Sequence, residues 1–298
     1  MNETFAISTD STSDFYAEEI KDLGLFVGKL NYTLEDKNGI TELLDDFKSY
    51  EDYVNFYNTL RQGVVARTSI LNFDAHVELF TEMAKSGIKT ALHITQGKGL
   101  SPTIDRANEA IEEVKKQFPD IDYRAIESNA TTVSEGNMVR IALKLREQGK
   151  TLDEAIEVIE KLKHQTQHFI AVNDLMHLKR GGRISGAAAT IGTILQLKPI
   201  IEFTKEGKLS VVRKENGIKK AYKSIINEVK QNFTFHNEFA FPKIVHTDNI
   251  EGAKILADMV KQEFGIEPEI RIMGPIIGAH VGPGAVAFTF VSNEQRKY

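Results

Sequence analysis

The sequence predicts an α/β protein, in which an N-terminal, mostly parallel sheet with helices on both faces precedes a smaller α+β domain. Short apolar runs alternate with helical patterns through the first half of the chain, which is typical of parallel sheets. Later strands pair with their sequence neighbours, and the 298 residues are long for one compact core. We therefore expect an N-terminal domain over residues 1–165 and a C-terminal domain over residues 166–298.

The N-terminal strands are predicted where buried apolar runs end in polar turns. They are TFAIST (4–9), KTALHIT (89–95) and DYRAIES (122–128). A helix follows the second strand, because Ser101 is a favourable N-cap and Pro102 suits the first helical position. Further helices are predicted after Asp74, from the third strand to about Gln148, and from Thr151, which opens a capping box.

The C-terminal pattern predicts local strand pairing with helices set between the strands. KPIIEF (198–203) and LSVVRK (209–214) flank the turn TKEG and indicate a hairpin. The other predicted strands are HFIAV (168–172), FPKIVHT (241–247), EIRIM (269–273) and AVAFTFV (285–291), and the helices cover about 217–231 and 250–264.

Composition and charge narrow the possible functions. The chain has no Cys, which excludes disulfides, thiolate nucleophiles and Cys-based metal sites and fits a cytoplasmic location. A net charge of −5 argues against nucleic acid as the partner. The N-terminus lacks the basic start and apolar run of a signal peptide, and no stretch reaches the ~20 apolar residues of a membrane span. The sequence also lacks a P-loop, a dinucleotide fingerprint, metal-binding histidine spacing and an esterase elbow.

Four polar segments are candidates for one binding site. They cover residues 8–14, 66–70, 95–103 and 274–285. Ligands of parallel α/β sheets lie beyond the carboxyl ends of the strands, so these segments can converge, and a helix N-terminus in the third attracts anions. The hydroxyls of Thr68 and Ser101 and the imidazole of His280 suit a buried carboxylate, which is costly unless it is hydrogen-bonded. Glycines around His280 allow close backbone approach, while Pro275 and Pro283 limit its motion.

Each of these features also has a purely structural interpretation. The Gly- and Pro-rich segment around His280 can be a connecting turn, and Ser101 can be only a helix cap. Asp14 can cap the first helix. The basic segment LKRGGRIS (178–185) is either a solvated turn or a contact for an anion or an acidic partner. His93 lies in a buried strand pattern and is interpreted as structural.

Taken together, these motifs resemble those of the DegV family, in the same order and over nearly the whole chain. The family's opening Asp-Ser-Thr/Ser-Asp corresponds to DSTSD (10–14), and its Thr-Ser pair corresponds to Thr68-Ser69. Its Leu-Ser-Gly-Thr-Tyr corresponds to LSPTI (100–104). The series is completed by LKRGGRIS (178–185), LQLKPII (195–201) and GAHVGPGA (278–285).

The resemblance implies a lipid-binding protein that is not itself an enzyme. DegV proteins are similar to the fatty-acid-binding subunits of bacterial fatty acid kinase, which hold one long-chain fatty acid between two domains. A separate ATP-binding kinase phosphorylates the carboxylate to an acyl phosphate, which agrees with the missing P-loop. An apolar tunnel for the tail would supply most of the affinity, at about 0.8 kcal/mol per buried methylene. The fatty acid is the ligand, and no metal, cofactor, nucleic acid or stable membrane insertion is implied.

The same resemblance assigns roles to individual residues. The carboxylate is expected to bind Thr68, Ser101 and His280. Arg180 and Arg183 are candidates for contacting the kinase or the phosphoryl group. The supporting loop positions are Ser69, Thr95, Gly97, Gly278 and Gly282.

This sequence departs from the family pattern near the expected head-group site. Ile70-Leu71 replaces Gln-Pro, Thr95-Gln96 replaces Ser-Ser, and Pro102 replaces a Gly. Lys98 is an extra cation that can approach the carboxylate.

Two other functions stay open. One is the substrate-binding subunit of a dihydroxyacetone-type kinase, in which a His binds a small ketone covalently, and the other is a non-catalytic regulatory module.

Overall fold

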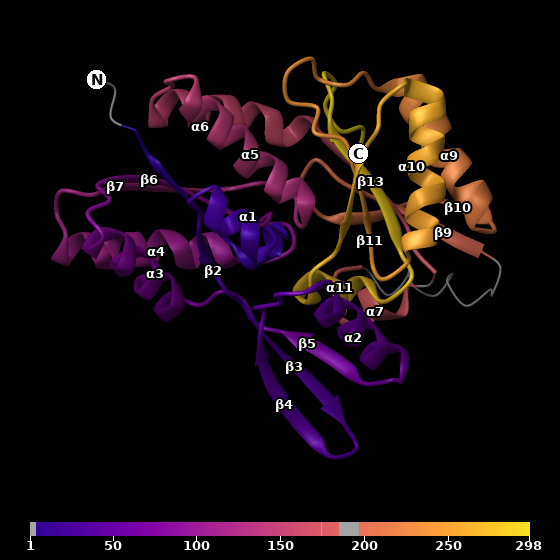
Figure 1. The fold of residues 1–298 in the computed structure, drawn as a ribbon, viewed down its shortest axis with the longest axis horizontal. Coiled ribbons are helices and arrows are strands. Elements are labelled where there is room, and N and C mark those ends of the chain that lie inside the picture. The colour runs from indigo at the N-terminus through magenta and orange to yellow at the C-terminus, as the bar shows by residue number, and fades with distance from the viewer. Residues whose placement is uncertain (1–3, 174, 185–196) are drawn as a thin grey trace.

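The computed structural model describes residues 4–173, 175–184 and 197–298, and its strands form three sheets (Figure 1). The first sheet is entirely parallel. Its strands run in the order β2 (Phe26–Gly28), β1 (Ala6–Asp10), β6 (Thr90–Thr95) and β7 (Asp122–Glu127). The predicted α/β class with a parallel N-terminal sheet is therefore confirmed.

Helices cover both faces of the parallel sheet, as Figure 1 shows. Strand alternation decides which residue faces which helices: Leu92 and Ile94 join one core, whereas Ala91 joins the other. The first core lies under α5 (Val133–Glu147) and α6 (Leu152–Leu162), and the second under α3 (Phe73–Lys85) and α4 (Thr103–Gln117). The capping box predicted at Thr151 is present and starts α6.

The second sheet is mixed and has six strands. Their order is β10 (Leu209–Asn216), β9 (Leu197–Phe203), β8 (Thr166–Ala171), β13 (Val286–Val291), β11 (Lys243–His246) and β12 (Glu269–Ile272). β11 and β12 are parallel, and the other neighbouring pairs, including the predicted hairpin of β9 and β10, are antiparallel. One face is covered by α9 (Ile218–Asn232) and α10 (Ile250–Phe264).

Alternation along β8 separates the two faces of the mixed sheet. Phe169 and Ala171 pack beneath α9 and α10, while Ile170 packs on the opposite face. His168 lies two residues before Ile170 and therefore shares its face. That face meets the N-terminal half of the chain, because Val133 of α5 belongs to the same core as Ile170. The same core takes in residues of α7 (Met176–Arg180) and α11 (Pro275–Val281).

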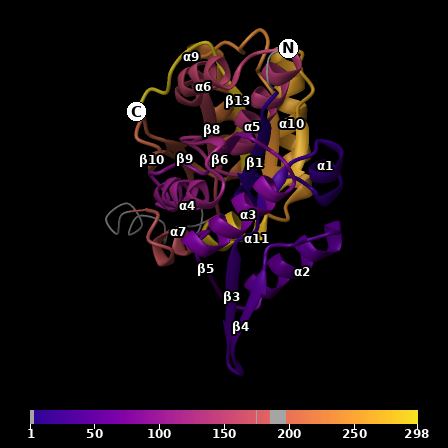
Figure 2. The same ribbon diagram turned by 90° about the vertical axis from the view of Figure 1, so that its left-hand side faces the viewer.

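A third sheet, for which the sequence analysis gives no prediction, projects from the body of the molecule (Figures 1 and 2). It is antiparallel, with the strand order β4 (Gly39–Leu44), β3 (Asn31–Asp36) and β5 (Val65–Thr68). The helix α2 (Tyr50–Arg61) connects β4 to β5 in the chain. All of β4 is exposed, so its sequence carries little apolar alternation. The fully buried Tyr57 ties α2 to the chain before α11, since its hydroxyl donates to the Met273 carbonyl at 2.8 Å.

Two segments expected to be irregular are partly helical. The chain around His280 forms α11, with Gly274 as N-cap and Pro275 in the first turn, where a missing N–H costs nothing. Glycine is required at position 278 of this helix, because a Cβ there would lie only 2.3 Å from the Tyr57 hydroxyl oxygen. The segment LKRGGRIS begins inside α7, which ends at Arg180. Its Ser185, like residues 195 and 196 of LQLKPII, lies outside the described residues.

Two of the helix caps suggested by the sequence are wrong. α4 begins at Thr103 after Pro102, and no side chain caps it, so Ser101 is not its cap. The short helix α1 (Ala17–Asp22) has Tyr16 as its N-cap. Asp14 instead follows the single turn η1 (Ser11–Ser13) in a left-handed conformation, with φ 56°. Its Oδ1 accepts from the Gly274 N–H at 3.0 Å, so Asp14 holds the start of α11.

The division into domains after residue 165 stays a prediction. All strands of the parallel sheet precede this point, and all strands of the mixed sheet follow it. The short turn η2 (Lys163–Gln165) occupies the proposed boundary.

Candidate ligand-binding site

A pocket lies where the three sheets meet. It contains about 640 Å³ of space that no atom fills, part of it open to solvent. The segments after β6 and β7, the end of β5, and residues of β8 and β9 all contribute to its wall. The apolar lining residues are Leu30, Ile70, Leu100, Ile170, Leu178, Phe203, Leu209, Met273, Ile276, Ile277 and Val281.

The structure brings the three predicted head-group residues into this one pocket. Thr68 ends β5, Ser101 precedes α4, and His280 lies in the last turn of α11. Thr68 Oγ1 and His280 Nε2 are 2.8 Å apart and share a hydrogen bond. Ser101 is buried, and its Oγ has no hydrogen-bond partner within the described parts of the chain. A buried hydroxyl without a partner is unfavourable, so this atom is suited to a ligand.

His280 is held as a neutral imidazole. Burial and then the charge of Arg183 lower the pKa of His280 to about 4, so the ring is uncharged near pH 7. Gly181 packs directly against the ring, because a Cβ built on Gly181 would lie 2.1 Å from His280 Nδ1. The ring is thus clamped between the end of α7 and Thr68.

The two candidate arginines lie in different environments. Arg183 lines the pocket and is half-buried, which lowers its pKa. Its Nε donates to the Leu100 carbonyl at 3.3 Å and its Nη1 donates to the Gly181 carbonyl at 2.5 Å. Arg180 is exposed at the end of α7 and does not line the pocket. The structure therefore places a cation in the pocket wall at Arg183 and one on the surface at Arg180.

Of the five supporting positions, Ser69 lines the pocket and the other four do not. Ser69 lines the pocket, but its hydroxyl donates to the Asn31 carbonyl at 3.1 Å. Thr95 is buried outside the lining and donates to the Gln96 carbonyl at 3.0 Å. Gly97, Gly278 and Gly282 act through the backbone: a Cβ on Gly97 would lie 2.9 Å from the Ala130 N, and one on Gly282 would lie 2.4 Å from the His177 ring. These glycines keep the walls close together.

Lys98 does not line the pocket. Its Nζ forms an ion pair with Asp105 at 2.7 Å, and both side chains are exposed. Its backbone N–H donates to Glu127 Oε2 at 3.2 Å. The expected approach of Lys98 to a carboxylate is therefore not seen.

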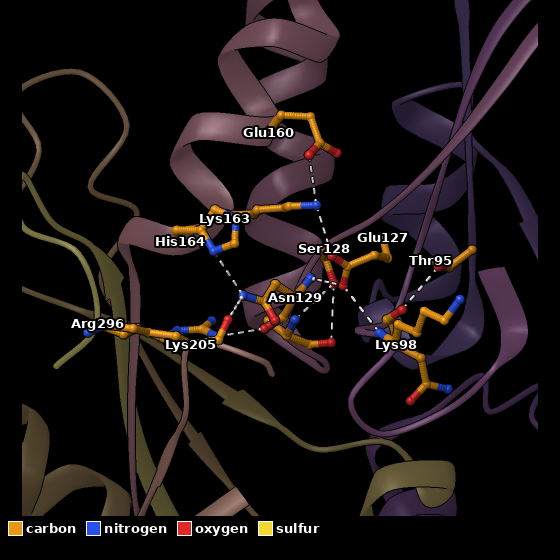
Figure 3. Close-up of polar contacts among 12 residues, drawn as sticks. Thr95, Lys98, Glu127, Ser128, Asn129, Glu160, Lys163, His164, Lys205 and Arg296 are labelled. Carbon is orange, nitrogen blue, oxygen red and sulfur yellow. Dashed lines mark hydrogen bonds and ion pairs between the residues drawn. The ribbon is translucent and has the colours of Figure 1, made fainter. Parts of the chain in front are cut away.

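A polar network supports the pocket wall beside this loop (Figure 3). Asn129, with φ 54°, donates from its side chain to the Lys205 carbonyl at 3.0 Å, and its own carbonyl accepts from Arg296 at 2.8 Å. Glu127 accepts from the Asn129 N–H at 2.7 Å and pairs with Lys163 at 2.8 Å. This network fixes the turn that leads into Thr131 and Thr132.

Sequence reasoning missed three polar residues of the pocket. Thr131 and Thr132 follow β7, and His168 lies in β8. The rule that ligands lie beyond the carboxyl ends of parallel strands would have selected the two threonines after DYRAIES. No sequence signal tells which face of its strand His168 occupies.

The segment STDSTSD lies outside the pocket and has a structural role. Asp10 caps η1 by accepting from the Thr12 N–H at 2.9 Å, and Glu135 accepts from Thr12 Oγ1 at 2.7 Å. Burial raises the pKa of both carboxyl groups.

Within the described ranges, no group of three or more His, Cys, Asp or Glu residues is arranged to hold a metal ion. None of the helices described is long and apolar enough to cross a membrane.

These features define an α/β protein with a mostly apolar pocket, at the meeting point of its sheets, that also contains a group of polar side chains. A family model described as "Uncharacterised protein, DegV family" matches residues 4–293. The chain belongs to the DegV family. A DegV domain-containing protein of Clostridium perfringens is 33% identical over 290 residues, covering 97% of this chain and 98% of that protein. One from Lactococcus lactis is 30% identical over 297 residues, covering 99% and 100%.

Solved structures share the fold over almost the full length. The fatty acid binding DegV family protein SAG1342 from Streptococcus agalactiae is 28% identical, with a TM-score of 0.80 and coverage of 97% of this chain and 99% of that one. A DegV family protein from Eubacterium eligens, loaded with heptadecanoic acid, is 21% identical, with a TM-score of 0.83 and coverage of 97% and 100%. A DegV lipid binding protein from Thermotoga maritima is 23% identical, with a TM-score of 0.84 and coverage of 99% and 100%.

Proposed function

We propose that this protein binds one long-chain fatty acid in the pocket, with the carboxylate between Thr68, Ser101 and His280. The observation that carries the proposal is the buried Ser101 hydroxyl, which lines the same pocket as the Thr68–His280 pair and has no hydrogen-bond partner among the residues described. The description of the Streptococcus agalactiae relative as fatty acid binding supports the same ligand.

The chemistry of the wall fits an amphipathic anion. Hydrogen bonds to a charged group contribute roughly 1.5–3 kcal/mol each. A carboxylate beside His280 favours the protonated imidazole, because opposite charges stabilise each other. The apolar lining receives the tail, and each buried methylene adds about 0.8 kcal/mol. A small polar ketone would gain little from such a lining, so the fatty acid is favoured over a dihydroxyacetone-type substrate.

We further propose that the bound carboxylate is presented to a separate ATP-dependent fatty acid kinase in the cytoplasm. The protein itself is then a non-catalytic binding subunit that needs no metal or cofactor. Arg183, in the pocket wall beside His280, is the candidate for contacting the phosphoryl group, and the exposed Arg180 for contacting the kinase.

The ligand is tested by extracting the purified protein and identifying bound lipids by mass spectrometry. Ser101→Ala and Thr68→Val are expected to weaken binding of a long-chain fatty acid by at least about tenfold. Ser86→Ala, at the exposed end of α3 and outside the pocket lining, is the control and should bind normally. Full affinity in both pocket variants would reject the assigned head-group site and would favour a regulatory module with a vestigial pocket.

The kinase step needs its own assay. With a fatty acid kinase and ATP, Arg183→Ala is expected to lower acyl-phosphate formation while the fatty acid stays bound. Arg180→Ala is expected to raise the kinase concentration needed for half-maximal rate. Absence of acyl phosphate from wild-type protein loaded with fatty acid would contradict the kinase role and leave the binding role standing.

A further inference from the structure

The pocket holds a second set of unsatisfied polar atoms besides Ser101. His168 Nε2, Thr131 Oγ1 and Thr132 Oγ1 are buried, and none of them has a hydrogen-bond partner in the part of the chain described. All three residues line the pocket. They lie on β8 and at the start of α5, whereas the head-group residues lie on β5, α11 and the segment before α4. The apolar wall therefore carries buried polar groups besides those of the head-group residues.

The hydrogen-bond chain behind His168 determines which of its ring nitrogens carries the proton. Thr289 Oγ1 donates its one proton to the Gln167 carbonyl at 2.7 Å. Ser134 Oγ, 2.6 Å from Thr289 Oγ1, must therefore be the donor in that pair. With its proton used there, Ser134 can only accept from His168 Nδ1, 2.7 Å away. His168 thus carries its proton on Nδ1.

His168 Nε2 is consequently a bare acceptor in the pocket. Burial, and then the charge of Arg296, lowers the pKa of His168 to about 3, so the ring stays neutral near pH 7. A ligand atom at Nε2 has to donate a proton. A carboxylate or ketone oxygen cannot do so, whereas an alcohol can donate to Nε2 and accept from a threonine hydroxyl.

The backbone at Thr132 is held in a costly conformation beside these polar groups. Thr132 has φ 57°, which a β-branched residue rarely adopts, and its hydroxyl caps nothing at the start of α5. Such strain persists when the surroundings enforce it, and it is concentrated at functional sites. Asn129, three residues earlier, also has a positive φ, of 54°, and is held by the polar network of Figure 3.

We propose that His168, Thr131 and Thr132 form a subsite for one hydroxyl group on the acyl chain, so that a hydroxylated fatty acid binds better than the plain chain. The inference rests on the proposed fatty acid function and names the class of acyl chain that the site selects.

The test compares stearic acid with a series of hydroxystearic acids that differ in hydroxyl position, and with the matching oxostearic acids, on delipidated full-length protein. One hydroxystearic isomer is expected to bind about tenfold more tightly than stearic acid, since one buried hydrogen bond is gained and an orphaned acceptor is satisfied. The matching oxo acid should show no such gain. His168→Phe should remove the preference while stearic acid still binds.

Two further variants separate this role from a merely structural one. Ser134 contacts no ligand in this scheme. Ser134→Ala removes the acceptor that fixes the proton on His168 Nδ1, so the binding preference should shift from the hydroxy acid toward the oxo acid. His93→Phe is the matched control, because His93 is also buried and also bonded to a serine, but lies outside the pocket. Its Nε2 likewise has no hydrogen-bond partner among the described residues. It should keep the wild-type preference.

The outcomes distinguish this subsite from the proposed function. Binding of stearic acid with no isomer favoured by more than about threefold, or a preference that survives His168→Phe, would overturn the subsite alone. Failure of every acyl chain to bind would overturn the fatty acid function and the subsite with it.

Discussion

Gly181→Ala is expected to weaken fatty acid binding by moving one ring. The added Cβ would lie 2.1 Å from His280 Nδ1 and 2.9 Å from its Cε1. An ordinary contact begins at 3.4 Å, so the imidazole must retreat by about 1.3 Å. The bond to Thr68 is 2.8 Å long, and such a displacement breaks it or turns the ring away from the carboxylate. The Gly181 backbone itself accepts Ala, because its φ is −76°.

The size of the effect follows from the lost contact. One hydrogen bond to a charged group contributes about 1.5–3 kcal/mol, so the Kd for a long-chain fatty acid should rise about 10- to 150-fold. The free protein offers a second measurement that needs no ligand. A displaced ring is better hydrated, so the pKa of His280 should rise from about 4 toward the ordinary value of 6.5 in an NMR titration.

Gly182→Asn is the matched control for this prediction. Gly182 is the next residue and has φ 69°, a backbone conformation that Asn tolerates. Among the described residues, no atom lies within 4 Å of its Cβ position. It should bind fatty acid normally. If Gly181→Ala also binds normally with an unchanged His280 pKa, the ring is not clamped as described, and its role in binding the head group has to be abandoned.

Three other predictions concern stability. Ser101→Ala should leave the free energy of unfolding unchanged or slightly higher in urea titrations, because Ser101 caps nothing; a loss of about 1 kcal/mol would restore the cap interpretation. Glu135 has a pKa raised well above 4.5 by burial and then by Asp10, so the native state retains a proton that the unfolded state loses and stability falls as pH rises. Glu135→Gln should therefore be more stable than wild type at about pH 8, with the gain shrinking toward pH 4.5; a pH-independent difference would show that Glu135 ionises normally. Arg296 is 4% exposed and donates to the Thr166 and Asn129 carbonyls, each at 2.8 Å. Arg296→Lys should therefore lower the free energy of unfolding by about 2–4 kcal/mol, because Lys lacks the planar guanidinium that reaches both carbonyls. A decrease of less than about 1 kcal/mol would contradict this role of the guanidinium.

Much of the fold could be predicted because its signals are local. The strand ending at Thr95, the capping box at Thr151 and the hairpin of β9 and β10 each depend on a few adjacent residues. The strand β4 could not be predicted in this way, because all of its residues are exposed and its apolar residues do not alternate. The start of α4 differs from the prediction although Ser101 and Pro102 have the chemistry of a cap and first turn. The N–H groups of Leu100 and Ser101 close a turn on the Gly97 carbonyl, which leaves Pro102 as the N-cap.

The sequence by itself determined the parallel N-terminal sheet, the family, and the residue types available to a head-group site, because periodicity and short motifs depend on neighbouring residues. Tertiary structure decided which of those residues meet. Thr68 and His280 are 212 positions apart and bond only because α11 packs on the end of β5. It also left the Ser101 hydroxyl without a hydrogen-bond partner among the described residues, paired Lys98 with Asp105 on the surface, and placed His168 in the pocket wall. The physical reason is that burial and hydrogen-bond satisfaction are properties of the packed chain, and a linear pattern records which groups exist but not which of them are left unpaired.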